Sequence, residues 1–447
     1  MEHSIRNFDA LAENDLRRDA LAIAEAGYAA INVGNALRSA LHITNDNLEV
    51  RTSDVLTSYS LVGRRVFFVG VGKCAFAAAS AIEEIFGDRL AGGIALDAIP
   101  LEALRKSDIH SSCGCLTSSS EIERIVGTHP LPSEANERAS ERIISLLSAR
   151  SEQDLVIMII SGGGSTLLCS PEAPMTCTDE STLFKELTAR GATIQDMNIV
   201  RKHLSRARGG GLARAAYPAE VISLIVSDVP GDDIAFVASG PTILDRSTVE
   251  DACAILVKYG IALPANVSFI ETEKEGHYFE RVTNTLLLAS RDALEAMRRE
   301  AERLGYTAEV ADEHFVGEAR EVGRGIVQSL HDTAPKTALL YAGESTVTIS
   351  GDHGSGGRNQ ELALAALAGI QGDELVMSFA SDGHDNTDHA GAIADATTRA
   401  RASMQNLSIE EHLDAHRSYD FFTTTQDALL TGYTGSNVSD LIIALKK

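Results

Sequence analysis

The sequence predicts an α/β protein built from two α/β domains with mainly parallel sheets. Short apolar runs alternate along the chain with amphipathic stretches of helical length. The apolar runs are continuous, which is typical of strands that are covered on both faces. Strands that alternate with helices form βαβ units, so we expect mainly parallel strand pairing.

The expected domain division follows from length and local charge. The 447 residues suffice for two or three domains at about 150 residues each. A charged stretch at residues 271–281 separates two sets of predicted strands. We therefore expect a Rossmann-like N-terminal domain at residues 1–265 and a second α/β domain at residues 266–447. A helical segment at residues 15–41 precedes the first strand and could pack on either domain.

The predicted elements follow in chain order. In the first domain we expect strands at residues 66–70, 93–96, 155–160 and 221–226, and helices at residues 75–86 and about 249–259. In the second domain we expect strands at residues 285–289, 337–342, 346–349 and 375–380, and helices at residues 292–304 and 358–370. A last helix is expected to begin at residues 435–437.

Charge and cysteine content argue against several classes of protein. The net charge of −24 counts against nucleic-acid binding, because phosphate backbones attract basic surfaces. A phosphate pocket stays compatible with this charge, since it needs only local positive charge. The six cysteines include one close pair, Cys113 and Cys115, without the second pair of a zinc site. They lack the density of secreted disulfide scaffolds, so we expect a reducing, cytoplasmic compartment.

The expected partners are small molecules. The N-terminal stretch is polar and no run of about 18 apolar residues occurs, so we expect neither a signal peptide nor a membrane span. We therefore expect no nucleic acid and no membrane among the partners, and a homodimer is one open option.

The first motif joins a predicted strand to a predicted helix through Gly70, Gly72 and Lys73. Such a turn lets backbone N–H groups approach an anion, which a helix N-terminus also favours. It is not a P-loop, because Phe67 stands where glycine is needed and Cys74 where serine or threonine is needed. We predict that both glycines contact a nucleotide. The alternative is a tight turn with an exposed lysine.

A second glycine-rich loop follows another predicted strand. Consecutive glycines are costly in chain entropy unless the backbone needs unusual angles. Their N–H groups can form a nest for a carboxylate or phosphate, to which flanking serines add hydroxyl donors. We predict cofactor binding by Ser161, Gly162, Gly163, Gly164 and Ser165. A flexible loop is the alternative.

A basic cluster lies at Arg201, Lys202, His203, Arg206 and Arg208 in this acidic chain. Arginine suits bidentate contact with carboxylate or phosphate. We expect Lys202 to contact the nucleotide. The alternative is a solvated helix face.

Three aspartates, Asp228, Asp232 and Asp233, lie just past the end of a predicted strand. Ligands of open α/β sheets bind at that end. Carboxylates there could hold Mg²⁺, which prefers oxygen ligands and keeps several waters. We predict Mg²⁺ at these three residues, with an aspartate-rich turn as the alternative.

The second half repeats the arrangement of a glycine-rich loop before a helix. Arg358 and Asn359 lie in the first turn of that predicted helix, and Asn437 lies at the expected start of the last one. We predict that both asparagines contact the nucleotide. His384 has no second histidine at metal-binding spacing, so we expect a hydrogen-bonded or solvated side chain.

Glycine-rich loops with nearby cations are typical of phosphoryl transfer, where positioning and charge stabilisation supply most of the catalysis. With these motifs, and with residues 128–132 and 382–383, the chain resembles the class II glycerate kinases, also called the MOFRL family. The resemblance runs from about residue 15 to the C-terminus. It implies two α/β domains, the second MOFRL-like, with the active site in the cleft between them. It also implies ATP, a divalent cation such as Mg²⁺, and conversion of D-glycerate to 2-phosphoglycerate.

The resemblance further implies that Lys73 and Arg358 are catalytic, and we add Asp228 to this set. Three positions depart from the family pattern. Cys74 and Phe76 stand where small residues are common, and Asn386 stands where glycine is usual.

Two other functions compete with the kinase. A NAD(P)H-dependent hydroxypyruvate reductase needs an acidic residue about 20 positions after its glycines, and the nearest candidate, Asp97, lies late. A non-catalytic sensor of sugar acids or nucleotides would be favoured by loss of Lys73 or Arg358, and both are present. The kinase is therefore the leading prediction.

Overall fold

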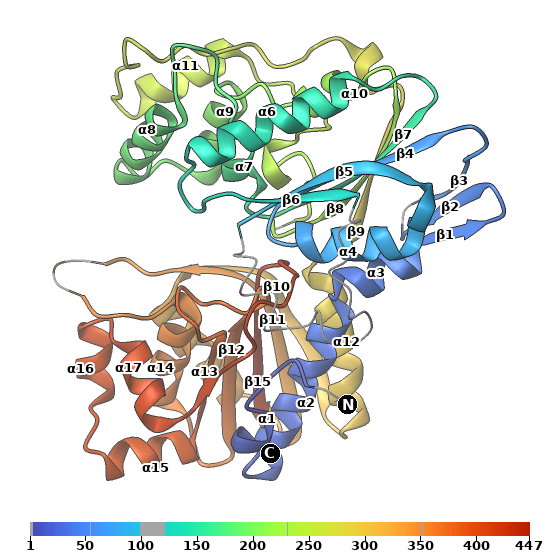
Figure 1. The fold of residues 1–447 in the computed structure, drawn as a ribbon. Helices are drawn as coiled ribbons and strands as arrows, with labels where there is room; N and C mark the ends of the chain where they lie inside the picture. The colour runs from blue at the N-terminus through green and yellow to red at the C-terminus, as the bar shows by residue number, and fades with distance from the viewer. Residues whose placement is uncertain (1–2, 54, 99–120, 230, 350, 352) are drawn as a thin grey trace. The chain divides into compact units, whose positions relative to one another are not determined.

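The computed structural model describes residues 3–53, 55–98, 121–229, 231–349, 351 and 353–447 (Figure 1). Contacts divide the chain into a first unit, Val33–Leu288, and a second unit, Met1–Asn32 with Ala289–Lys447. This division differs from the predicted boundary at residues 265/266. Residues 282–288 group with the first unit because they form its last strand, β9, which pairs with β8.

The first unit contains a six-stranded sheet in the order β6-β5-β4-β7-β8-β9, and all its pairings are parallel. Strands β4 and β7 lie in the middle and are almost wholly buried, which explains their continuous apolar sequences. The parallel α/β arrangement expected for this half is confirmed. The strands are β4 (Arg65–Val71), β5 (Leu90–Asp97), β6 (Ile122–Val126), β7 (Asp154–Ser161), β8 (Glu220–Val226) and β9 (Val282–Leu288).

Helices cover both faces of this sheet (Figure 1). On one face, side chains of α6 and α10 pack with Val69, Met158 and Ile225 in one buried cluster. Helix α4 packs on β4 and β5 from the other face. A second apolar cluster joins α8, α9 and α11. The helices are α3 (Val33–Ala40), α4 (Ala75–Phe86), α6 (Glu134–Ser148), α7 (Gly164–Leu167), α8 (Cys177–Ala189), α9 (Ile194–Lys202), α10 (Gly211–Ala216) and α11 (Val249–Lys258).

Several short elements complete the first unit. An antiparallel sheet is formed by β1 (Leu41–Thr44), β2 (Asn47–Arg51) and β3 (Leu56–Ser60), which the sequence analysis did not predict. The 3-10 turns are η1 (Gly87–Arg89), η2 (Val237–Ser239) and η3 (Gly276–Phe279).

The second unit contains a mixed sheet in the order β10-β11-β15-β12-β13-β14. Of its pairings, β10 with β11 is parallel and the other four are antiparallel. The expectation of mainly parallel pairing is therefore wrong for this sheet. The last strand inserts antiparallel between β11 and β12, and β13 and β14 extend the sheet by two more antiparallel pairings. The strands are β10 (Thr307–Glu318), β11 (Thr337–Thr346), β12 (Glu374–Ala380), β13 (Gly391–Asp395), β14 (Ala428–Leu429) and β15 (Asp440–Lys446).

Two predicted elements of this unit are corrected. The segment that begins at residues 435–437 leads into strand β15, not into a helix. Residues 346–349 form no separate strand, because β11 runs without a break to Thr346 and ends there. The other predicted strands and helices of the second unit are confirmed in type.

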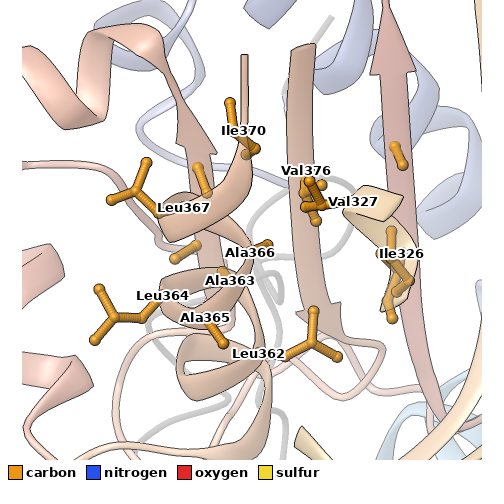
Figure 2. Close-up of a cluster of buried hydrophobic side chains, with 14 of the residues drawn as sticks. Ile326, Val327, Leu362, Ala363, Leu364, Ala365, Ala366, Leu367, Ile370 and Val376 are labelled. Carbon is orange, nitrogen blue, oxygen red and sulfur yellow. The ribbon is translucent and has the colours of Figure 1, made fainter. Parts of the chain in front are cut away.

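Helix α14 supplies a large share of one buried core cluster in the second unit (Figure 2). Every residue of this helix from Asn359 to Leu367 is buried, and it packs with Ile326 and Val327 of α13 and with Val376 of β12. On the other face, α2 and α12 pack together, and a side chain at Gly27 would meet the Met297 sulfur at 2.8 Å. The helices are α1 (Phe8–Leu11), α2 (Asp15–Ala30), α12 (Ser290–Arg303), α13 (Ala319–His331), α14 (Arg358–Gly369), α15 (Ala396–Met404), α16 (Ile409–Asp414) and α17 (Ser418–Thr425).

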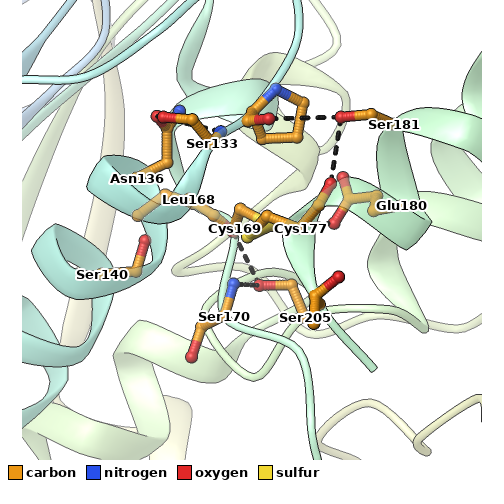
Figure 3. Close-up of a disulfide and its surroundings, with 12 residues drawn as sticks. Ser133, Asn136, Ser140, Leu168, Cys169, Ser170, Cys177, Glu180, Ser181 and Ser205 are labelled. Carbon is orange, nitrogen blue, oxygen red and sulfur yellow. Dashed lines mark hydrogen bonds between the residues drawn. A yellow bond between two sulfur atoms is a disulfide. The ribbon is translucent and has the colours of Figure 1, made fainter. Parts of the chain in front are cut away.

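A disulfide joins Cys169 to Cys177 at the start of α8 (Figure 3). Both cysteines are buried, and the nearby Ser205 hydroxyl donates to the Leu168 carbonyl at 2.7 Å. The expected reducing, cytoplasmic compartment rested on the absence of the dense disulfide pattern of secreted scaffolds, which one bond does not create, so it stays a prediction. Cys113 and Cys115 lie outside the described residues.

Within the described ranges, none of the helices combines the length and the apolar character needed to cross a bilayer.

The N-terminal helix α2 is held in the second unit by a buried ion cluster. The Arg17 side chain is fully buried and bonds both oxygens of Asp395 at 2.7 Å. It also lies 2.8 Å from a carboxylate oxygen of Asp427, which is buried as well. Removing the cation would leave two buried carboxylates without their main counter-charge.

We therefore expect Arg17→Met to lower the free energy of unfolding by about 3–5 kcal/mol at neutral pH. The stranded carboxylates should gain raised pKa values, so the folded variant binds extra protons and its stability deficit should shrink as pH falls. Urea unfolding of the wild type and the variant across a pH series measures this. Arg18→Met is the matched control, because Arg18 pairs with Asp15 on the surface and should cost less than about 1 kcal/mol. Equal losses for the two variants at every pH would contradict the assignment.

Candidate active site

In the first unit, three of the predicted motifs come together at one edge of the sheet. Strands β4, β7 and β8 are parallel neighbours, with Val71 opposite Ile160 and Ser161 opposite Val226. The loops that follow them therefore leave the sheet side by side at the carboxyl edge, where open α/β sheets bind ligands. These loops carry Lys73, residues 162–165 and Asp228.

The turn at Gly70 to Lys73 has little free hydrogen-bonding capacity in its backbone. The Gly72 N–H donates to the Leu96 carbonyl at 3.1 Å, and the Lys73 N–H donates to the Gly162 carbonyl at 3.0 Å. A side chain at Gly72 would meet the Ser161 hydroxyl at 2.1 Å, so close packing against β7 requires this glycine. Ser161 is fully buried and faces the same turn, where its hydroxyl lies 3.4 Å from the Cys74 nitrogen. We therefore interpret the turn as a structural support for the Lys73 side chain.

A carboxylate of the protein already occupies the N-terminus of α4. Asp97, at the end of β5, is buried and accepts a hydrogen bond from the Phe76 N–H at 3.1 Å. Cys74 just before this helix is buried too, and burial raises the pKa of its thiol to about 12. Cys74 thus remains a neutral thiol, and Asp97 serves the helix.

The second glycine-rich loop is different, because its N–H groups stay available. Within the part of the chain that the structure describes, the backbone N–H groups of Gly163, Gly164 and Ser165 donate to no protein acceptor. A side chain added at Gly163 would lie 3.3 Å from the Lys73 stem and 3.5 Å from the His129 ring. Lys73 and His129 thus flank an open row of donors.

The same loop rests on a segment with unusual backbone angles. Ala238 and Ser239 have φ values of 51° and 61°, in the left-handed region that such residues rarely adopt. A side chain at Gly164 would meet the Ala238 methyl at 2.6 Å, and the Ser165 and Ser239 hydroxyls lie 2.8 Å apart. Sparsely populated conformations gather at functional sites. No role was assigned to His129 or Ser239 from sequence, although His129 lies in the motif at residues 128–132.

The three aspartates after β8 are not gathered into one ligand group. Asp228 is half-buried near the strand end, whereas Asp233 is exposed and accepts the Ala235 N–H at 3.0 Å. Asp232 has a φ of 53° within the same turn. Among the described residues, no group of three or more His, Cys, Asp or Glu side chains could hold a metal ion.

The basic cluster is internal structure. The Lys202 ammonium pairs with buried Asp245 at 3.0 Å, and Arg208 pairs with buried Glu180 at 2.8 Å. The Arg201 guanidinium lies 3.8 Å from the centre of the Phe184 ring, and burial lowers its pKa to about 10. Both expectations for this cluster, a nucleotide contact by Lys202 and a solvated face, therefore differ from the observed packing.

In the second unit, Arg358 begins α14 beside the ends of β11 and β12. Its Nε donates to one oxygen of Asp440 at 2.5 Å, and its Nη2 lies 3.2 Å from the other and 2.9 Å from Glu344. Burial opposes the charge of Arg358, and these two carboxylates raise its pKa above the ordinary arginine value. Burial raises the pKa of Asp440 to about 7, while Arg358 lowers it and Glu344 raises it.

The N-terminus of α14 is also filled by the protein itself. Buried Asp385 accepts the N–H groups of Asn359 and Gln360 at 3.0 and 2.8 Å. The Asn359 side chain is buried and accepts the Ser378 hydroxyl at 2.6 Å. Asn359 therefore lies in the interior, not on a surface open to a nucleotide.

The remaining predicted residues lie in neighbouring loops. Asn437 is nearly buried and precedes β15, next to Val438, whose N–H donates to the Ser381 hydroxyl at 2.9 Å. Asn386 has a φ of 59°, a left-handed conformation that asparagine tolerates better than most other non-glycine residues. The His384 ring stacks on Tyr433 with centroids 3.8 Å apart. The predicted cleft between the two halves stays a prediction.

A cavity of about 240 Å³ lies elsewhere in the first unit, between α6 and α10. None of the predicted site residues lines it, and we place no chemistry there. It is lined by Ile144, Ser148, Arg206, Gly211, Arg214, Ala215 and Tyr217.

Two families match the chain. Residues 19–270 match a family described as a domain of unknown function (DUF4147), and residues 337–440 match the MOFRL family. Among individual relatives, a glycerate 2-kinase of Pyrococcus horikoshii is 33% identical over 96% of this chain and 97% of its own. A protein of Agrobacterium vitis with a provisional hydroxypyruvate reductase name is 37% identical over 84% of this chain and 86% of its own.

A solved structure shows the same fold. The glycerate kinase of Thermotoga maritima matches with a TM-score of 0.77 and 29% identity, covering 97% of this chain and 99% of that one. Since the sequence matches extend through both units, the chain belongs to the MOFRL family of glycerate kinases that its motifs resemble.

Proposed function

We propose that this protein is an ATP-dependent glycerate 2-kinase that converts D-glycerate to 2-phosphoglycerate and releases ADP. The observation that carries the proposal is the match to glycerate 2-kinases over nearly the whole chain, with Lys73 present just after β4 and Arg358 at the start of α14. We propose Lys73, Arg358 and Asp228 as the catalytic residues.

The loop after β7 supports phosphate binding. Its open N–H groups at Gly163, Gly164 and Ser165 can donate to anionic oxygens, as backbone nests do. Lys73 lies beside this row and adds a positive charge. In phosphoryl transfer, charge spreads over three oxygens in the transition state, and a positioned cation stabilises it. Lys73 is therefore assigned to the transferring phosphoryl group.

Arg358 supplies a second, anchored cation. Asp440 and Glu344 use only some of the N–H donors of its planar guanidinium. The donors that they do not use suit carboxylate or phosphate oxygens. We assign it to an anionic group of the substrates. Arg358→Lys should not substitute for it, because an ammonium offers a point charge where a fork is needed.

A divalent cation fits the first unit through one carboxylate. Mg²⁺ is commonly held by one or two carboxylates together with substrate phosphates and waters, so the lack of a three-carboxylate group does not argue against it. Asp228 is the residue that would hold it, since it lies at the same strand edge as the glycine-rich loop. The ion would neutralise charge on the ATP phosphates.

The hydroxypyruvate reductase alternative depends on Asp97 as its candidate ribose-binding carboxylate, and Asp97 is already engaged within the protein. A dinucleotide site needs a carboxylate that is free to bind a ribose hydroxyl. Asp97 is buried and accepts the Phe76 N–H.

We propose that the enzyme acts in the cytoplasm on small molecules, and a homodimer stays a prediction.

The first test separates kinase from reductase. With MgATP and D-glycerate we expect equal amounts of ADP and phosphoglycerate, while NADH should not be consumed with hydroxypyruvate. A coupled ADP-release assay across three- and four-carbon sugar acids, run beside an NADH absorbance assay, measures both. Oxidation of NADH by hydroxypyruvate with no ATP-dependent product would refute the kinase.

Lys73→Met should lower kcat by about 10²–10³, equivalent to ~3–4 kcal/mol, because it deletes a cation that stabilises developing charge. The melting temperature should change little, since methionine keeps most of the side-chain stem. Lys185→Met is the matched control, because Lys185 is exposed on α8. A near-normal kcat, or a loss explained by unfolding, would remove Lys73 from the mechanism.

Activity should vanish with a chelator and return with Mg²⁺ or Mn²⁺. Asp228→Asn should raise the Mg²⁺ concentration needed for half-maximal rate, because it removes the carboxylate that holds the ion. Steady-state rates across a Mg²⁺ series measure this effect. If Asp228→Asn and Asp232→Asn both keep wild-type turnover and metal dependence, these aspartates only form a turn.

A further inference from the structure

The guanidinium of Arg358 is held along one edge. Asp440 takes the Nε and Nη2 positions with its two oxygens, and Glu344 takes a further contact at Nη2. The Asp440 side chain is 2% exposed, whereas that of Arg358 is 35% exposed. A buried carboxylate therefore holds one edge of a guanidinium whose side chain is itself only partly buried.

Asp440 and Arg358 both lie on rigid secondary-structure elements. Asp440 is the first residue of β15 and is paired with Gly343 on one side and Ala380 on the other. Arg358 begins α14, whose first turn is fixed by Asp385. Because neither backbone can shift easily, the carboxylate determines the orientation of the fork.

One nitrogen of the fork remains for a ligand. A guanidinium has five N–H donors, and the contacts above use those of Nε and Nη2. Among the residues whose positions are described, none pairs with Nη1 of Arg358. As far as the described residues show, the Nη1 donors therefore remain available for an anionic oxygen.

We propose that Asp440 is a positioning residue that orients Arg358 so that Nη1 faces the substrates. This inference rests on the proposed function, in which Arg358 contacts an anionic group. Asp440 itself touches no substrate in this account. Its role is to hold the fork, as residues behind a catalytic group commonly do.

The test is a double-mutant cycle in kcat with Asp440→Asn, Arg358→Met and the double variant. Asp440→Asn should lower kcat about 10²-fold, as expected for a misplaced catalytic group, and change the KM for D-glycerate much less. The double variant should be no slower than Arg358→Met, because a residue that acts through another adds nothing once that partner is gone. Multiplying effects, or a wild-type kcat for Asp440→Asn, would overturn the proposal.

Asp154→Asn is the matched control. Asp154 is also the buried first residue of a central strand and also grips an arginine fork, that of Arg65, at 2.8 and 2.9 Å. It lies at the opposite end of its sheet from the glycine-rich loop. Asp154→Asn should lower the stability of the protein and leave kcat unchanged. If Asp154→Asn and Asp440→Asn lowered kcat equally, the loss of any buried ion pair would slow the enzyme, and Asp440 would have no special role.

Two further measurements keep the proposal open to refutation. If Asp440→Asn fails to fold, Asp440→Glu keeps the charge but displaces the fork, and a wild-type kcat for it would overturn the role. Separately, nitrogen-15 NMR of labelled arginine reads the Arg358 Nε–H without any turnover. That signal should exchange slowly with water in the wild type and in Asp154→Asn, and quickly in Asp440→Asn. Slow exchange in Asp440→Asn would contradict the hold of Asp440 on Arg358. Failure of the wild type to phosphorylate D-glycerate would contradict the proposed function alone.

Discussion

The pairing of β15 with both β11 and β12 is the constraint on which the second unit depends. This strand is the last in the chain, yet it lies inside the sheet and is buried along almost its whole length. Its position sets the antiparallel pairings on either side and places Asp440 between the ends of β11 and β12. The location of Arg358 follows, because its fork is fixed by that carboxylate.

Both units use their own carboxylates where helix N-termini would attract foreign anions. Asp97 occupies the start of α4 and Asp385 the start of α14. A helix N-terminus favours negative charge, so these buried acids stabilise the turns and remove them as phosphate sites. The donors left over are the N–H groups around Gly164. In the proposed function, anion binding in the first unit is therefore assigned to the loop after β7.

The sequence predicted the central strands that helices cover on both faces, and it missed strands at exposed edges and strands whose preceding residues suggest another element. Strands β4, β7 and β8 are continuous apolar runs because helices bury both faces. Strand β10 lies at a sheet edge with most side chains exposed, so it carries no such run. Strand β15 is apolar, but the glycine and asparagine before it resemble a helix start and concealed it.

The site was predictable in place but less so in detail. Loops at the carboxyl ends of parallel strands could be expected to bind ligands, which located Lys73, Asp228 and the glycine-rich loop correctly at one edge. The partners of Lys202 and Asn359 are Asp245 and Asp385, 43 and 26 residues away. Such pairings depend on tertiary contacts, which no local pattern records, so both residues looked available for a nucleotide.

The proposed enzyme phosphorylates the hydroxyl on carbon 2 of D-glycerate. Proton-coupled phosphorus NMR of the reaction product tests it most directly, because the splitting reports how many hydrogens the phosphorylated carbon bears. We expect a doublet, from the single hydrogen on carbon 2, that appears only with both ATP and D-glycerate. A triplet, from the two hydrogens on carbon 3, or no new phosphate ester signal would contradict it.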